Sequence, residues 1–307
     1  MIKRRFTEIP VIELSHISKR FGKFVAVNDL SFSVEQGEFF GFIGPNGAGK
    51  STTMNMMLNF IKRSGGEISL LGKNVPQHDL EVKKRIGYVP SDVRFYPQLR
   101  VQDLIRYTLD FHQMKGDQAE IDRYCELFQI DRKKKFGDLS LGNKKKVALV
   151  CALIHHPELI IMDEPTNGLD PLMHARLFRV LKEKQEQGAT IFLSSHNLKE
   201  VEDYCSKVAF IRSGQLIGVE DLSQVNKKMK IVVLKGSKLP LDEMKAIGAA
   251  CTKKEEHEAR FLYEGGLPQL FSTLSNLSAD LEDVTVANRD LEEQFMSMYE
   301  RQEGERL

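Results

Sequence analysis

Continuous apolar runs alternate with segments of helical periodicity along the chain up to about residue 220. The runs Phe39–Ile43, Leu159–Met162 and Thr190–Leu193 are almost wholly apolar, which is typical of strands buried on both faces. Apolar residues at helical spacing predict helices over Ser51–Phe60, Val101–Gln113, Gln118–Phe128, Val147–His155 and His174–Gln187. Strands that alternate with helices predict an α/β core with a mainly parallel sheet covered on both faces.

Shorter apolar segments add strands and an inserted unit to this core. Further strands are predicted at Val11–Leu14, Leu30–Val34, Glu67–Leu71 and Ile86–Val89. Two predicted helices follow one another between Pro97 and about Phe136, so we expect a helical insertion there. Together with the start of the next helix, this helical subdomain spans about residues 97–145.

The pattern changes near residue 222, where the long apolar runs end. Strands are predicted at Lys230–Lys235, Ala259–Glu264 and Asp283–Ala287, and helices at Leu241–Ile247, Leu267–Leu277 and Asp290–Glu300. Asp290 and Glu293 have the spacing of a capping box for the last helix. We therefore expect two domains, residues 1–221 and 222–307, of which the second is a small α+β unit such as a ferredoxin-like fold.

Composition excludes several kinds of protein. The 307 residues include 44 lysines and arginines against 43 aspartates and glutamates, a balance that gives no support to nucleic-acid binding. The cysteines Cys125, Cys151, Cys205 and Cys251 are too far apart for a metal or redox motif, which favours a reducing cytosolic setting. No apolar stretch approaches the roughly 20 residues that span a bilayer, and residues 1–6 lack a secretory signal. We expect no covalent membrane anchor, so any membrane-spanning part must come from a partner.

The segment Gly44-Pro-Asn-Gly-Ala-Gly-Lys50-Ser51 fits the phosphate-binding loop pattern in full, between a predicted buried strand and a predicted helix. Glycines let backbone N–H groups converge on phosphate oxygens, and the positive end of the helix dipole points at the same anion. Lys50 supplies a charge for the β- and γ-phosphates, and the Ser51 hydroxyl is a ligand for Mg²⁺. The expected ATP-binding residues are Gly44, Pro45, Asn46, Gly47, Ala48, Gly49, Lys50, Ser51 and Thr52.

A second apolar strand delivers two carboxylates, Asp163 and Glu164, to its end. Asp163 can hold the metal ion through water, and Glu164 can accept a proton from an attacking water molecule as general base. Many strands end in solvated acids, so the pair is informative because it lies downstream of the phosphate-binding loop and precedes Pro165.

Between these motifs, Leu139-Ser-Leu-Gly-Asn143 resembles the Leu-Ser-Gly-Gly-Gln signature of ATP-binding-cassette (ABC) proteins. Ser140 and Gly142 match that signature, whereas Leu141 and Asn143 depart from it. Ser140 also caps the helix that follows, and such a helix start attracts anions. The resemblance implies that Ser140, Leu141, Gly142 and Asn143 face the γ-phosphate bound by a second subunit.

Other landmarks follow in the order of that family. Gly168-Leu-Asp170 resembles the D-loop, with Asn167 where serine is commoner, and His196 resembles the switch histidine that contacts the γ-phosphate. Phe21 resembles the aromatic residue that stacks on adenine, although a core phenylalanine is the alternative. The resemblance covers residues 11–220, and the subunits most similar in character are ATPases of bacterial drug, peptide-antibiotic and sodium exporters.

The main departure is Ser91, at the position where most cassettes have the glutamine of the Q-loop. Serine is about two heavy atoms shorter and offers only a hydroxyl, so we expect any contact with Mg²⁺ to pass through a bridging water. We expect this loop to act mainly in coupling to a permease, through Tyr96–Leu99. For the lysine runs Lys133–Lys135 and Lys144–Lys146 we favour solvated helical faces over contact with anionic lipid.

The resemblance implies a P-loop NTPase core with an antiparallel N-terminal β-subdomain, a helical insertion and the small C-terminal domain. We expect Mg²⁺-dependent ATP hydrolysis by a head-to-tail homodimer that drives a separate membrane permease, for export, from the cytoplasmic face of the membrane as a peripheral subunit. The alternative is a soluble ABC-type ATPase without a transport role. A regulator that binds nucleotide without hydrolysis is disfavoured by Glu164 and His196.

Overall fold

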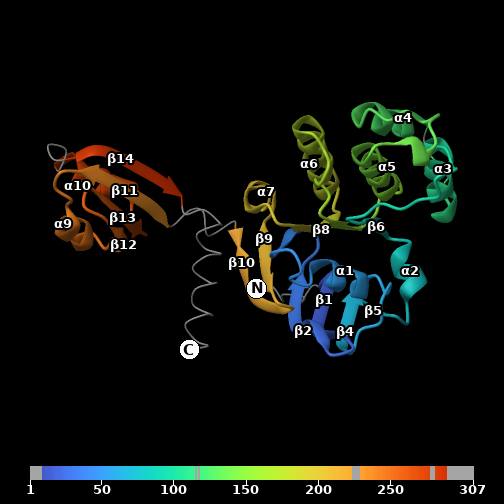
Figure 1. Cartoon of the computed structure of the whole chain (residues 1–307), viewed down its shortest axis with the longest axis horizontal. Helices are drawn as coiled ribbons and strands as arrows, with labels where there is room; N and C mark the ends of the chain where they lie inside the picture. Colours follow the sequence, from blue (N-terminus) through green and yellow to red (C-terminus); the bar gives the residue numbers. More distant parts are fainter. Residues whose placement is uncertain (1–8, 115, 117, 223–228, 277–280, 289–307) are drawn as a thin grey trace, which may run out of the picture. The chain divides into compact units, whose positions relative to one another are not determined.

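The computed structural model describes residues 9–288 apart from 115, 117, 223–228 and 277–280. The chain divides into two compact units, residues 1–219 and 220–307 (Figure 1). The predicted helix Asp290–Glu300 lies outside the described residues. None of the helices in the described ranges combines the length and apolar character needed to cross a membrane.

The first unit begins with an antiparallel sheet in the order β2-β1-β4-β5. Its strands are β1 (Ile12–Phe21), β2 (Phe24–Val34), β4 (Gly65–Leu70) and β5 (Lys73–Val75). β1 and β2 form a hairpin much longer than the predicted strands Val11–Leu14 and Leu30–Val34. Irregular register along this hairpin, with positive φ at His16 (51°) and Asp29 (56°), interrupts the alternation on which the sequence prediction relied.

A six-stranded sheet in the order β10-β9-β3-β8-β7-β6 forms the centre of the unit. Its strands are β3 (Phe39–Ile43), β6 (Ile86–Val89), β7 (Leu159–Asp163), β8 (Thr190–Ser195), β9 (Lys207–Arg212) and β10 (Gln215–Asp221). Pairing is parallel from β9 through β3, β8 and β7 to β6. β3 and β7 are buried at every residue, which confirms the interpretation of their apolar runs.

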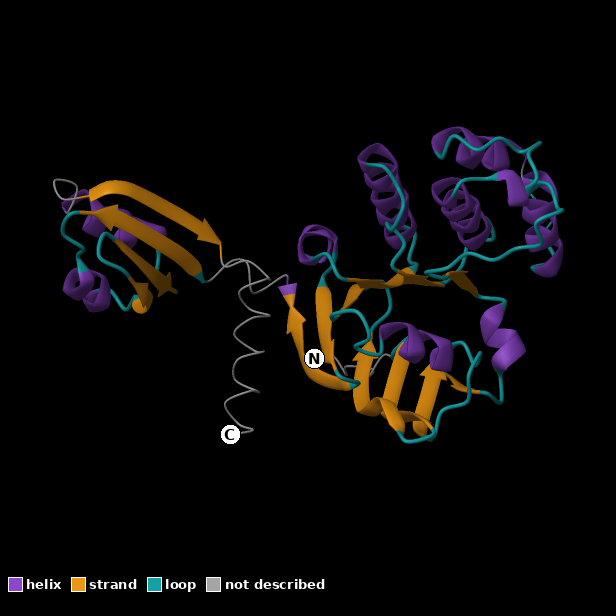
Figure 2. Ribbon diagram, in the orientation of Figure 1, coloured by secondary structure: helices purple, strands orange, loops and turns teal. Residues whose placement is uncertain are grey.

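Helices cover both faces of this sheet, as Figure 2 shows. The helices described in the first unit are α1 (Lys50–Met57), α2 (Asp79–Lys83), α3 (Val101–Phe111), α4 (Gln118–Leu127), the 3-10 turn η1 (Phe136–Asp138), α5 (Leu141–Leu153), α6 (Pro171–Glu186) and α7 (Leu198–Tyr204). α1 lies between the two sheets, whereas α5, α6 and α7 lie on the opposite face (Figure 1). The predicted α/β fold is confirmed, and α5 starts at Leu141, which agrees with the cap predicted at Ser140 and joins it to the helix predicted from Val147.

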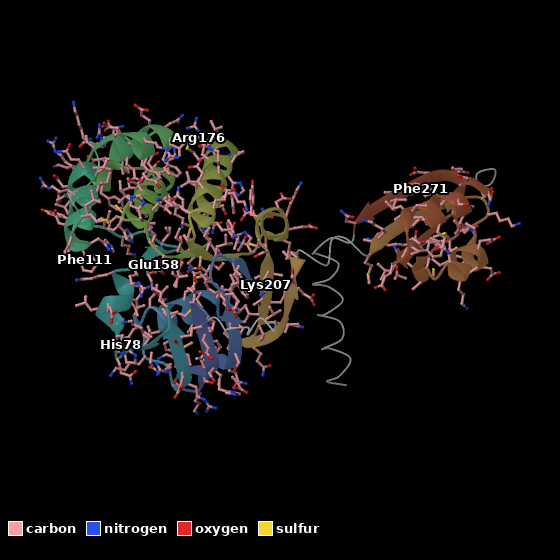
Figure 3. All side chains as sticks on the ribbon, turned by 180° about the vertical axis from the view of Figure 1, so that it is seen from behind. His78, Phe111, Glu158, Arg176, Lys207 and Phe271 are labelled. Carbon is pink, nitrogen blue, oxygen red and sulfur yellow. The ribbon has the colours of Figure 1, made fainter. Side chains whose placement is uncertain are left out.

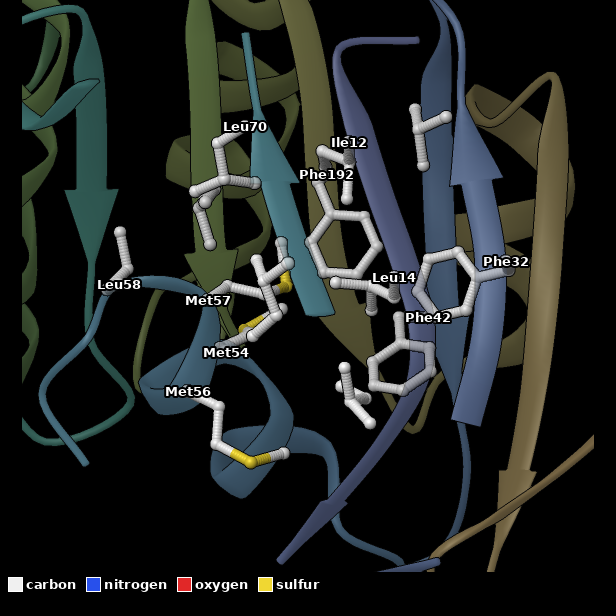
Figure 4. Close-up of a cluster of buried hydrophobic side chains, with 14 of the residues drawn as sticks. Ile12, Leu14, Phe32, Phe42, Met54, Met56, Met57, Leu58, Leu70 and Phe192 are labelled. Atoms are coloured by element: carbon white, nitrogen blue, oxygen red, sulfur yellow. The ribbon is translucent and has the colours of Figure 1, made fainter. Parts of the chain in front are cut away.

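The main core of the first unit fills the space between α1 and the two sheets (Figure 4). Met54 and Met57 of α1 pack there with Leu14 of β1, Phe42 of β3 and Phe192 of β8, all fully or almost fully buried. On the other face, the Arg176 guanidinium of α6 donates a hydrogen bond of 2.6 Å to the Leu127 carbonyl at the end of α4 (Figure 3). These contacts fix the helix that follows the phosphate-binding loop and join the helical insertion to α6.

The second unit has strands and helices in the order β11, α9, β12, β13, α10, β14. They are β11 (Lys230–Gly236), α9 (Leu241–Ala246), β12 (Ala250–Lys254), β13 (Glu258–Tyr263), α10 (Leu267–Asn276) and β14 (Leu281–Asn288). The strands form an antiparallel sheet in the order β12-β13-β11-β14, which is the ferredoxin-like arrangement. Its own core includes Leu234, Met244, Phe261 and Leu270.

Candidate nucleotide-binding site

The carboxyl ends of β3, β7 and β8 meet at one edge of the central sheet. Ile43 pairs with Ser195, and Asp163 pairs with Ser194, so the segments that follow these strands begin side by side. Ligands of open α/β sheets bind at this edge. The fold therefore brings together the phosphate-binding loop, Glu164 and the segment that carries His196.

At two positions of the phosphate-binding loop, the surrounding backbone leaves room only for glycine. A Cβ atom on Gly44 would lie 2.2 Å from the Ile211 carbonyl oxygen, and one on Gly49 would lie 2.8 Å from the Ala26 carbonyl oxygen. Gly49 also has a φ of 110°, in the left-handed region. These close approaches hold the loop against β9 and β2, with the first turn of α1 directly after it.

Lys50 is the first residue of α1, and its side chain is only 5% exposed. Its ammonium group donates to the carbonyl oxygens of Gly44 at 2.7 Å and Pro45 at 3.2 Å. The backbone N–H groups of the first turn have no acceptor within the helix, and they favour an anion together with the helix dipole. The Lys50 side chain thus folds back over the phosphate-binding loop, where its positive charge would attract a bound phosphate.

The two carboxylates at the end of β7 have different surroundings. Asp163 is 1% exposed, and its Oδ1 accepts a hydrogen bond of 2.6 Å from the Ser194 hydroxyl. The Glu164 backbone N–H donates to that same hydroxyl oxygen at 3.0 Å. Glu164 itself has a φ of 47°, a strained conformation for a residue with a side chain, which directs its carboxylate toward Lys50.

Three polar groups surround the Glu164 carboxylate. Lys50 Nζ lies 3.4 Å and His196 Nδ1 lies 3.6 Å from Oε1, while the Asn167 amide donates to Oε2 at 2.5 Å. Burial by itself would raise the pKa of Glu164, but Lys50, Asn167 and His196 outweigh that effect and hold the pKa below its usual value. Glu164 is therefore ionised at neutral pH and able to accept a proton.

A buried glutamate that sequence reasoning missed connects the segments around this site. Glu200 of α7 is 7% exposed and accepts hydrogen bonds from the Ser195 hydroxyl (3.0 Å), the Thr166 hydroxyl (3.3 Å) and the Asn197 amide (3.2 Å). The two hydroxyls bind Oε2, whereas the Asn197 amide and His174 Nε2 of α6, at 2.9 Å, contact Oε1. The only sequence signal is its place four residues after His196, because Thr166 and His174, the partners that connect Glu200 to other segments, are 34 and 26 residues away in the chain.

Asp170 and Ser140 both cap helices. Asp170 Oδ1 accepts from the Met173 N–H at 2.9 Å at the start of α6, and the Ser140 hydroxyl accepts from the Asn143 N–H at 3.4 Å at the start of α5. A Cβ atom on Gly142 would lie 2.6 Å from the Gly168 carbonyl oxygen, so the signature segment packs closely against the D-loop segment of the same chain. Leu141 beside it is 66% exposed.

Phe21 is the last residue of β1 and is 50% exposed, which excludes the alternative of a core phenylalanine. Lys19 Nζ lies 4.7 Å from the centre of its ring. An exposed aromatic face of this kind is available for stacking on a planar group.

The expectation that both lysine runs are solvated helical faces is wrong in part. Lys133–Lys135 are exposed, but they lie in a turn and an isolated β-bridge and not on a helix. In the second run, Lys145 and Lys146 are buried. They are buried because α5 is enclosed on all sides from Lys145 onward. Lys145 contacts the backbone at Ser91, whose own side chain is exposed.

The oxygens at the site suit a divalent cation whose remaining ligands are phosphate oxygens and water. Serine hydroxyl and aspartate oxygens, as on Ser51 and Asp163, are the type of ligand that Mg²⁺ prefers. Within the described ranges, no group of three or more histidine, cysteine, aspartate or glutamate side chains forms a metal cage. That donor set fits Mg²⁺, which keeps several waters and binds through few carboxylates.

Comparisons with known proteins agree with this geometry. Residues 27–167 match the ABC transporter family. An uncharacterized ABC transporter ATP-binding protein of Synechocystis sp. is 35% identical over 93% of this chain and 84% of its own length. The bacitracin transport ATP-binding protein of Bacillus licheniformis is 36% identical over 67% of this chain and 68% of its own length. A solved ATP-binding subunit of an ABC transporter superposes with a TM-score of 0.65 at 29% identity, covering 71% of this chain and 92% of that one.

The fold and these relatives define a nucleotide-binding cassette, and the chain belongs to the ABC transporter family. Within that family it is an ATP-binding subunit, an ATPase whose hydrolysis energises a transporter.

Proposed function

We propose that this chain hydrolyses Mg-ATP to drive a separate membrane permease in the direction of export. The observation that carries the proposal is the convergence of Lys50 and His196 on one oxygen of Glu164, at 3.4 and 3.6 Å. Three groups with complementary roles would thus lie at one edge of the sheet. They are Lys50 as a charge for the phosphates, His196 as a contact for the γ-phosphate and Glu164 as general base. Export is supported by relatives named for linearmycin resistance, bacitracin transport and Nod factor export.

The proposed reaction assigns a role to each group. The loop Gly44–Gly49 and Lys50 bind the phosphates, and Phe21 stacks on adenine. Ser51 and Asp163 would hold Mg²⁺, Asp163 through water, and the ion when bound neutralises charge on the phosphate oxygens. Glu164 accepts the proton of the attacking water, because its lowered pKa keeps it ionised.

We further propose that two copies act as a head-to-tail homodimer. Each nucleotide would lie between the phosphate-binding loop of one subunit and the start of α5 in the other, where Ser140 caps the helix. The exposure of Leu141 at that helix start supports this assignment, because an exposed apolar side chain there can be covered by a partner.

The permease would bind at the loop after β6, on the cytoplasmic face of the membrane. Tyr96 in this loop is 77% exposed, and Phe111 at the end of α3 is 52% exposed. Large exposed aromatic side chains mark protein interfaces. The chain would thus be a peripheral subunit, and its partner would supply the membrane-spanning helices.

The test is phosphate release from Mg-ATP by the purified full chain, with Lys50→Ala as the comparison. We expect the variant to lose ATP affinity by titration calorimetry, because the phosphates lose their nearest fixed cation. Unchanged ATP binding by Lys50→Ala would overturn the assignment of the loop. A neighbouring reading frame that encodes a multi-span membrane protein would supply the permease for a second test, and ATPase activity left unchanged by that protein would favour a soluble ATPase without a transport role.

A further inference from the structure

Lys145 is a buried cation close to the nucleotide site. It lies in the second turn of α5, after the signature segment, and is 2% exposed. A buried ammonium group is costly unless hydrogen bonds or opposite charges compensate for its lost hydration. The partners of Lys145 therefore indicate why a lysine occupies this position.

The Lys145 ammonium donates to two consecutive backbone carbonyls across the fold. Its Nζ lies 2.9 Å from the Pro90 oxygen and 3.2 Å from the Ser91 oxygen. Both carbonyls belong to the loop that leaves β6, at the position where the family has the Q-loop glutamine. The contact joins segments that are 55 and 54 residues apart in the chain.

The charge of Lys145 also acts on the carboxylates of the site. Burial lowers the pKa of Lys145 to about 8, and the carboxylates of Asp163, Glu164 and Asp92 oppose that lowering. The ammonium group is thus within electrostatic reach of the two acids at the end of β7. It has both a hydrogen-bonding role at the loop and an electrostatic one beside the reaction site.

We propose that Lys145 is a positioning residue that ties the signature helix α5 to the Ser91 loop and holds the backbone of that loop beside Asp163 and Glu164. A serine at position 91 is too short to reach the site as a glutamine would, so the connection is made through backbone carbonyls instead. The inference rests on the proposed ATPase function and names a further residue for it.

The experiment compares Lys145→Met with wild type and with Lys134→Met, a control at an exposed lysine. Methionine fills a similar volume, and the loss of two hydrogen bonds is opposed by the removal of a buried charge, so we expect little change in Tm. We expect kcat for Mg-ATP to fall on the order of 10- to 100-fold, because the loop loses its fixed position, with KM almost unchanged. Lys134→Met should behave as wild type.

Lys145→Arg is the conservative variant, since it keeps a cation with several donors. We expect it to retain more activity than Lys145→Met. Wild-type kcat in Lys145→Met would overturn the proposal. So would a loss of Tm that parallels the loss of rate, or unfolding of both variants, because either result assigns Lys145 to stability alone.

The proposed function is judged separately in the same assay. Hydrolysis by wild type that Lys50→Ala abolishes supports the ATPase site whatever Lys145→Met does. If wild type shows no hydrolysis, the proposed function and this inference both fail, whereas an active wild type with an equally active Lys145→Met counts against Lys145 only.

Discussion

At the scale of single residues, the environment of Glu164 suits the proposed role of its carboxylate as general base. Its backbone is held in the left-handed region at a φ of 47°. Such strain persists only where the surroundings enforce it, and here the Ser194 hydroxyl fixes the Glu164 N–H. Lys50 and His196 then attract the charged form of its carboxylate. Conformation and electrostatics together present an ionised oxygen to the site.

We predict that Glu164→Gln leaves ATP binding intact and slows turnover about 10²- to 10⁴-fold, the usual contribution of a general base. Glutamine keeps the shape and one acceptor oxygen but cannot take up the proton. Phosphate release and titration calorimetry measure the two effects, and light scattering should show an ATP-dependent dimer of the variant. Glu126→Gln, at an exposed glutamate of α4, serves as control. Full turnover by Glu164→Gln would remove Glu164 from the role of base.

The segments that the structure brings to one edge of the sheet are those whose sequence motifs are contiguous. Gly44–Ser51 and the pair Asp163 and Glu164 could be recognised because each motif lies within a few residues and follows a buried strand. The roles of Glu200 and Lys145 could not, since Thr166 and His174 for Glu200, and Pro90 and Ser91 for Lys145, are brought near only by the fold. The apolar residues after Lys146 did carry a signal that the helix is enclosed on all sides.

At the scale of elements, the three predicted strands with continuous apolar runs agree with the structure to within two residues, because burial on both faces leaves a clear pattern. The helices α2 and α7 and the strands β5, β9, β10 and β12 were missed, although the buried run Val208–Ile211 of β9 carries the same apolar pattern. α7 has only seven residues, and β12 is exposed along its whole length, so neither shows a hydrophobic period. Short or exposed elements depend on tertiary contacts that a local pattern does not contain.

The short helix α7 nevertheless orders three segments of the site through Glu200. We predict that Glu200→Gln lowers kcat and Tm together while ATP affinity stays close to wild type. The glutamine amide would place N–H donors against groups that already donate, a mismatch of about 1–3 kcal/mol in a buried network. Thermal unfolding and steady-state kinetics test this, with Asp203→Asn on the exposed face of α7 as control. Unchanged kcat and Tm would show that the hydrogen bonds of Glu200 contribute to neither turnover nor stability.

At the scale of the whole molecule, the chain contains hydrophobic cores that do not share residues. The core around α1 draws on residues between Val11 and Ile211, and the core of the second unit draws on residues between Val232 and Leu274. Every site residue named above lies in the first unit. Separate cores are typical of domains that fold alone.

We predict that a chain ending at Asp221, which keeps all of β10, folds and binds ATP without the second unit. The reason is that the deletion removes a complete ferredoxin-like core and leaves the core around α1 intact. Circular dichroism should show one cooperative thermal transition for the shortened chain, and titration calorimetry should give an ATP affinity close to that of the full chain. Lys50→Ala in the shortened chain is the control for specific binding. An insoluble product, or one without a cooperative transition, would mean that the first unit needs the second to complete its packing, and the boundary would then have to be redrawn.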